Sequence, residues 1–177
     1  MKAGKTEISA GGVLLLAALY FFMDIRGLAA LALAVSAHEL GHVAALRLCG
    51  SSIRDFRADL GGLLIIPDSG LSPGSELFCL AAGPFSGLLY AFFASCSSSG
   101  LLLCSSGMSL ALSLFNLLPC PPLDGGGITT AIFGPGVARC CGLLTALLLF
   151  ISGFALCVGG QGAALFLAGA ILLVKNV

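Results

Sequence analysis

Charged residues are scarce in this sequence. They make up 9% of the 177 residues, whereas 58% are hydrophobic and the mean hydropathy is +1.10. A soluble globular domain carries about 25% charged residues. The composition therefore excludes an ordinary soluble domain and indicates a chain that lies in a lipid bilayer.

The sequence also lacks an excess of basic residues. Eight Lys and Arg balance eight Asp and Glu, and no basic run alternates with aromatic residues. Proteins that bind nucleic acids usually present such a basic surface. A nucleic-acid partner is therefore not expected.

Paired cysteine motifs are absent, although the chain has eight cysteines. No two of them are spaced as C-x-x-C, and all lie in apolar surroundings, so the spacings typical of zinc sites are missing. We predict that the cysteines are small buried hydrophobic residues. A disulfide between Cys96 and Cys104, which flank one short loop, is the alternative.

Apolar stretches account for most of the chain. A membrane-spanning helix needs about 20 apolar residues, and the stretches that approach this length are 10–23, 28–48, 77–95, 101–118, 143–158 and 163–174. We predict an all-α polytopic membrane protein with about six transmembrane helices. It would form one domain, 1–177, with a core at 28–127 and C-terminal helices at 143–174. The last two stretches are short, and a re-entrant hairpin is the alternative for them.

The basic residues in the short flanks predict the orientation. With six spans, all of them except Arg26 fall on the side that carries both termini. Cytoplasmic flanks are enriched in Lys and Arg. Both termini are therefore predicted to be cytoplasmic.

Segment 50–75 holds most of the polar residues between the spans. Polar and apolar residues alternate on either side of Gly61-Gly62, which predicts a small β-hairpin at the membrane surface between spans two and three. An open strand edge there, at Ile65, would bind an extended substrate segment as an added strand. A passive connector is the alternative.

Span two contains the motif H-E-x-x-H, as His38-Glu39-Leu40-Gly41-His42. Histidines at i and i+4 lie on one face of a helix, where both can bind one Zn²⁺ while the glutamate acts as general base. Ionisable residues inside an apolar helix cost about 2.5–3.5 kcal/mol. A divalent cation would compensate that cost, so the motif predicts a zinc site.

A catalytic zinc usually has three protein ligands and one open position. Asp124 is the obvious third ligand, because it follows the proline-rich end of span four and precedes three glycines. Prolines stop regular helix and glycines permit tight turns. We therefore expect Asp124 on an irregular segment at the end of the span, in an enclosed and wet metal site.

The two motifs together, H-E-L-G-H and N-x-x-P-x-P-x-x-D-G, resemble those of the site-2 protease family of intramembrane metalloproteases. The resemblance covers 28–127. It implies one Zn²⁺ per chain, held by His38, His42 and Asp124, with Glu39 as catalytic base and Asn116 beside the substrate. Ala82-Gly83-Pro84 also resembles the family pattern G-P-x-x-N, but Gly87 stands where the asparagine would be.

The six-span layout is most similar to the bacterial stage IV sporulation branch of that family, although no C-terminal nucleotide-sensing domain is seen in the sequence. Members of that branch release a membrane-tethered sigma-factor precursor. The resemblance implies a membrane-tethered protein substrate, regulatory membrane partners, and a place in the bacterial cell membrane or the membrane around the forespore.

The predicted function is that of a zinc metalloendopeptidase acting in regulated intramembrane proteolysis. Glu39 would accept a proton from water and deliver it to the leaving amine. Asn116 would donate a hydrogen bond to the oxyanion or the substrate backbone; a helix-end residue bonded to its own backbone is the alternative. The rival functions are a metal-ion transporter or channel, and an inactive relative that only binds substrates.

Overall fold

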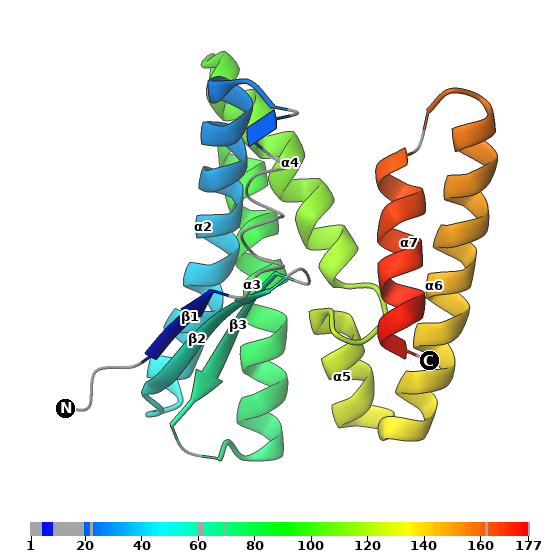
Figure 1. Cartoon of the computed structure of the whole chain (residues 1–177). Helices are drawn as coiled ribbons and strands as arrows, with labels where there is room; N and C mark the ends of the chain where they lie inside the picture. The colour runs from blue at the N-terminus through cyan, green and yellow to red at the C-terminus, as the bar shows by residue number, and fades with distance from the viewer. Residues whose placement is uncertain are drawn as a thin grey trace. The chain divides into compact units, whose positions relative to one another are not determined.

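The computed structural model describes residues 5–8, 20–21, 23–59, 62–68, 70–161 and 163–176. Figure 1 shows the helices and strands of these residues. They are β1 (Lys5–Ile8), α2 (Ile25–Leu48), β2 (Ile53–Asp59), β3 (Gly62–Pro67), α3 (Pro73–Ser95), α4 (Gly100–Asn116), α5 (Asp124–Phe133), α6 (Pro135–Val158) and α7 (Ala163–Asn176).

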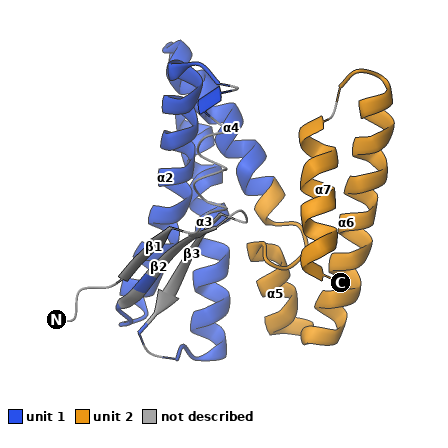
Figure 2. Ribbon diagram, viewed as in Figure 1, with its two compact units in different colours: residues 1–114 blue, residues 115–177 orange. Residues whose placement is uncertain are grey.

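Two compact units divide the chain. Unit 1 is Met1–Leu114 and unit 2 is Phe115–Val177 (Figure 2). The boundary falls inside the predicted core 28–127, near the end of α4. The organisation into a single domain stays a prediction.

Within the described residues, three helices are long and apolar enough to cross a membrane, as judged by length and composition: α2, α3 and α6. Helices α4 and α7 are apolar but shorter, with 17 and 14 residues. These five helices correspond to the predicted spans from 28–48 onward. The first predicted span, 10–23, lies almost entirely outside the described residues, and the total of six spans stays a prediction.

Local capping explains where the long helices begin. The Asp24 side chain accepts a hydrogen bond from Gly27 N at 2.8 Å, so α2 begins at Ile25 and not at residue 28. Helix α6 begins at Pro135, upstream of the predicted 143, because proline is well suited to the first turn of a helix. Gly134, with φ 85°, separates it from α5.

The strands form a three-stranded sheet in the order β1-β2-β3. Strands β2 and β3 pair antiparallel, with Phe56 opposite Ile65, and Leu60 and Gly61 of the predicted turn lie outside the described residues. Strand β1 pairs with β2 in parallel, Lys5 opposite Asp55. Strand β1 was not predicted from the sequence, because its partner strand is far away along the chain. The order leaves β3 at an edge of the sheet.

Serine side chains join α4 to α3 within unit 1. Ser106 Oγ donates to Ala91 O at 2.8 Å, and Ser109 Oγ donates to Gly87 O at 2.9 Å. Both serines are buried. Small residues allow two helices to approach closely, and hydroxyl groups can then bond to the neighbouring backbone. The contact needs little apolar bulk, which suits helices that lie in lipid.

Unit 2 has its own core, at the end of the α6–α7 pair. Its buried residues are Cys120, Leu123, Ala146 and Leu172. Farther along the pair, Gly153 faces the backbone of Phe166, and a Cβ added to Gly153 would collide with it. Gly169 faces the backbone of Phe150 in the same way. Helices α6 and α7 therefore pack with their backbones in close contact.

Candidate metal centre

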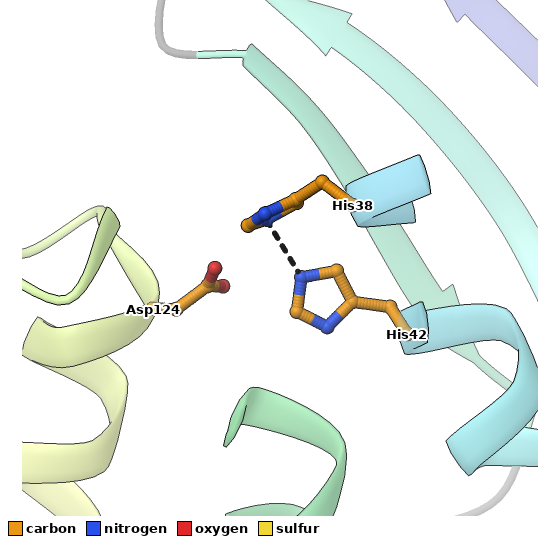
Figure 3. Close-up of side chains that lie close together, drawn as sticks. All are labelled: His38, His42 and Asp124. Carbon is orange, nitrogen blue, oxygen red and sulfur yellow. Dashed lines mark hydrogen bonds between the residues drawn. The ribbon is translucent and has the colours of Figure 1, made fainter. Parts of the chain in front are cut away.

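Two imidazoles of α2 face each other. His38 Nε2 and His42 Nε2 are 3.2 Å apart, and the ring centroids are 4.9 Å apart in an edge-to-face arrangement (Figure 3). His38 is 3% exposed and His42 is partly buried. The spacing of four residues on one helix brings them together, as the sequence predicted.

A backbone carbonyl of α3 orients the second imidazole. His42 Nδ1 lies 2.8 Å from Cys79 O. A carbonyl only accepts, so Nδ1 donates the hydrogen bond and Nε2 is the ring nitrogen that faces His38. Metal-binding histidines are commonly held in this way by their second nitrogen.

The separation of the two Nε2 atoms fits a zinc ion. In a tetrahedral site with Zn–N bonds of about 2.0–2.1 Å, two ligand nitrogens are about 3.3 Å apart. The 3.2 Å between His38 and His42 agrees with that value. A divalent cation could therefore bind between the two nitrogens.

Small residues of α3 make room for the His42 ring. A Cβ on Gly83 would overlap His42 Nε2 itself. Ser86 Oγ donates to Ala37 O at 2.8 Å, which ties α3 to α2 one residue before the motif. The sequence indicated Gly83 only through its resemblance to a family pattern. It gave no signal for the roles of Cys79 O and Ser86.

Glu39 follows His38 directly on α2, and its side chain is partly buried. A glutamate at this position lies on the part of the helix surface next to the imidazole pair. It is thus a carboxylate within the apolar helix, close to both histidines in sequence. This placement suits a proton acceptor, and its role stays a prediction.

Asp124 belongs to unit 2, where it is the first residue of α5 (Figure 3). The expectation of an irregular segment was wrong for this residue, although it holds for 117–123 before it. Leu123 is the N-cap and makes no side-chain capping bond. The positive end of the helix dipole favours a negative carboxylate in the first turn. Asp124 therefore offers an anionic oxygen ligand at a helix start.

The glycines after Asp124 allow the preceding segment to fold against α5. A Cβ on Gly125 would collide with Leu117 O, and one on Gly126 would collide with Pro121 N. Both glycines are buried. Segment 117–123 is consequently packed directly on the first turn of the helix that presents Asp124.

The structure says less about the surroundings of the remaining predicted site residues. Asn116 is the last residue of α4, in unit 2, and is partly buried. Ile65 lies in the edge strand β3, and its side chain is outside the described residues. At Gly87, the space that a Cβ would need is taken by Ser113 Oγ. An asparagine at that position would therefore displace Ser113.

The cysteines depart from the prediction that they are buried. All eight are free, so no disulfide joins Cys96 to Cys104. Only Cys79 and Cys120 are buried, and four cysteines are exposed. Burial raises the pKa of the Cys120 thiol, while the hydrogen bond from Asn176 acts in the opposite direction. Cys120 is thus a protonated thiol at neutral pH and not a thiolate ligand.

Comparison with known proteins shows which fold the chain has. No protein-family model matches the chain, and no curated protein matches its sequence. Among solved structures, the chain is similar to the Site-2 Protease from Methanocaldococcus jannaschii, at 22% sequence identity and a TM-score of 0.76. The similarity covers 99% of this chain and 90% of that chain. The protein therefore shares the fold of that protease.

Proposed function

We propose that this protein is an intramembrane zinc metalloprotease of the site-2 protease type. The observation that carries the proposal is the pair of α2 imidazoles, with Nε2 atoms 3.2 Å apart and His42 oriented by Cys79 O. The fold shared with a site-2 protease and the apolar helices α2, α3 and α6 support it.

We assign Asp124 as the third ligand of one zinc ion per chain. His38, His42 and Asp124 each offer one ligand atom, two imidazole nitrogens and a carboxylate oxygen. Three such ligands leave a fourth position for water or substrate, as in other catalytic zinc sites. The negative charge of Asp124 also balances the cation better than a third histidine would.

Zinc bound there would act as a Lewis acid toward the scissile carbonyl and make water more acidic. Glu39 accepts the proton of the attacking water and passes it to the nitrogen of the leaving amine. A carboxylate can make both transfers, because it accepts a proton when ionised and donates it when protonated. Glu39 can therefore serve first as base and then as acid.

Asn116 is proposed to donate a side-chain hydrogen bond to the oxyanion or to the substrate backbone. It ends α4, next to the break in regular helix at 117–123. Loss of one donor to an oxyanion typically lowers kcat by about 100- to 1,000-fold. The alternative is that the Asn116 amide bonds only to its own backbone, in which case its removal leaves kcat unchanged.

The substrate class we propose is a membrane-tethered regulatory protein, cut in regulated intramembrane proteolysis. The edge strand β3, with Ile65, would bind it in extended form. We further propose a bacterial cell membrane or forespore-surrounding membrane, regulatory membrane partners, and both termini in the cytoplasm. The sporulation branch remains the proposed relationship.

Metal analysis of the purified chain tests the proposal. We expect about one zinc per chain. Replacing His38, His42 or Asp124 by Ala should reduce zinc occupancy sharply, whereas Glu39→Gln should keep the zinc and abolish cleavage of a co-expressed membrane-tethered reporter. Full occupancy in Asp124→Ala would remove Asp124 from the ligand set. Zinc flux through liposomes that contain the chain would instead favour the transporter.

A further inference from the structure

The segment before Asp124 has few backbone hydrogen-bond donors. Residues 117–123 include Pro119, Pro121 and Pro122, none of which has a backbone N–H. The backbone bonds within the segment run from Cys120 N to Leu118 O and from Leu123 N to Cys120 O. Buried carbonyls nearly always find a partner. Those carbonyls of the segment that are buried therefore need donors from other parts of the protein.

Asn176, at the end of α7, supplies one. Its Nδ2 donates to Pro121 O at 2.6 Å and to Leu172 O at 2.9 Å, so both amide hydrogens have a carbonyl acceptor. The same nitrogen lies 3.5 Å from Cys120 Sγ. Figure 1 shows the end of α7 beside the loop between α4 and α5. The Asn176 side chain is 7% exposed.

A second contact holds the same segment to α6. Cys120 Sγ lies 3.4 Å from Gly142 O, and Cys120 packs with Leu123 in the buried core of unit 2. Asn176 and Cys120 therefore fasten the proline-rich segment to both helices of the α6–α7 pair. Since Leu123 is the N-cap of α5, this attachment reaches the residue directly before Asp124.

We propose that Asn176 is a positioning residue for Asp124. Its amide fixes segment 117–123 and so sets the position of the Asp124 carboxylate at the start of α5. This inference rests on the proposed function, because it assumes that Asp124 is a zinc ligand. The α6–α7 pair would then hold that ligand in place. Asn176 itself touches neither metal nor substrate. Its removal should weaken zinc binding without removing a ligand.

The test compares Asn176→Leu with Val174→Ala in the full chain, purified in detergent. Leucine has the same branching and the same number of side-chain heavy atoms as asparagine but no donor, and Val174 is 82% exposed on the same helix. Zinc affinity, measured by competition with a chelator, should fall about 10-fold or more in Asn176→Leu, as it does when groups that hold a ligand are removed. The visible absorption bands of the cobalt-substituted chain should shift. Val174→Ala should match the native chain in both measurements.

A second variant covers the case in which Asn176→Leu does not fold. A Cβ on Gly142 would lie 2.7 Å from Asn176 Oδ1 and 2.9 Å from Pro121 Cδ, so Gly142→Ala should push the amide away while leaving it intact. The inference is overturned if a folded Asn176→Leu, or failing that a folded Gly142→Ala, binds zinc as the native chain does and has its cobalt spectrum. Helical circular dichroism establishes folding.

Alkylation of Cys120 separates this inference from the proposed function. The thiol is 0% exposed in the native chain and should react slowly with a maleimide, as mapped by mass spectrometry. In Asn176→Leu it should react at least several-fold faster, even if the native chain binds no zinc. Absent zinc would then refute the proposed function, and an unchanged Cys120 rate would refute the attachment of the segment by Asn176.

Discussion

At the residue scale, the proposed zinc site depends on the orientation of one imidazole. Cys79 O holds His42 Nδ1, and the missing side chain of Gly83 leaves space for Nε2. Neither contact involves a group that is itself reactive. A substitution that introduces no charge, such as one at Gly83, can therefore disturb the proposed metal site.

Gly83→Ala is predicted to impair zinc binding. The added methyl group would overlap His42 Nε2, so the ring must rotate away from His38 or α3 must move. Overpacking of this kind typically costs about 1–3 kcal/mol in stability. We expect zinc affinity to fall at least about 10-fold, measured by chelator competition.

Gly74→Ala in the same helix is the matched control, because nothing lies within 4 Å of a Cβ there. It should bind zinc like the native chain. Equal affinities of the two variants would mean that the His42 ring is not confined by Gly83.

The histidine pair could be predicted from the sequence, but the contacts that orient His42 could not. His38 and His42 form a pattern at i and i+4, which helix geometry alone converts into one face. The partner of His42 is a backbone carbonyl of Cys79, and any residue type at that position would offer the same atom. Gly83 likewise matters for a side chain that it lacks. Such contacts become visible only once α2 and α3 are placed together.

At the element scale, the departures from prediction have local causes. Helix α5 begins with Asp124 and three glycines, which are poor helix formers, so the sequence favoured a loop. Packing on segment 117–123 overrides that propensity, since Gly125 and Gly126 allow the close contact. The boundaries of α2 and α6 moved because Asp24 and Pro135 act as start signals upstream of the apolar stretches.

The next prediction concerns substrate binding at the edge of strand β3. If its edge binds an extended substrate by main-chain hydrogen bonds, Ile65→Pro should impair cleavage of a cognate substrate much more than Ile65→Thr, because proline has no N–H to donate. Cleavage is measured by immunoblot of the co-expressed substrate. Zinc content and membrane expression should stay near native in both variants.

A folded and zinc-loaded Ile65→Pro that cleaves as well as Ile65→Thr would show that segment 50–75 is a connector. Substrate alignment would then have to come from elsewhere, with Asn116 as the next residue to test.

At the scale of the whole molecule, both termini are predicted to lie in the cytoplasm, because Lys and Arg in the short flanks gather on one side. Fluorescent-protein and alkaline-phosphatase fusions at residues 1 and 177 measure this directly. We expect fluorescence and no phosphatase activity at both ends. Signals from opposite sides would mean that one short apolar segment does not span, and α7 would be the first to re-examine.

The backbone contact between α6 and α7 bears on how the protein is made. Helix α7 has 14 residues and is about 21 Å long, whereas the hydrocarbon layer is about 30 Å thick. If α7 left the translocation channel by itself, it would be too short to insert stably into the bilayer. Joined to α6 at Gly153 and Gly169, it can partition into lipid together with the longer helix as a helical hairpin. Asn176 would then reach segment 117–123 only after the hairpin has assembled, so that completion of the proposed zinc site would be a late step in maturation.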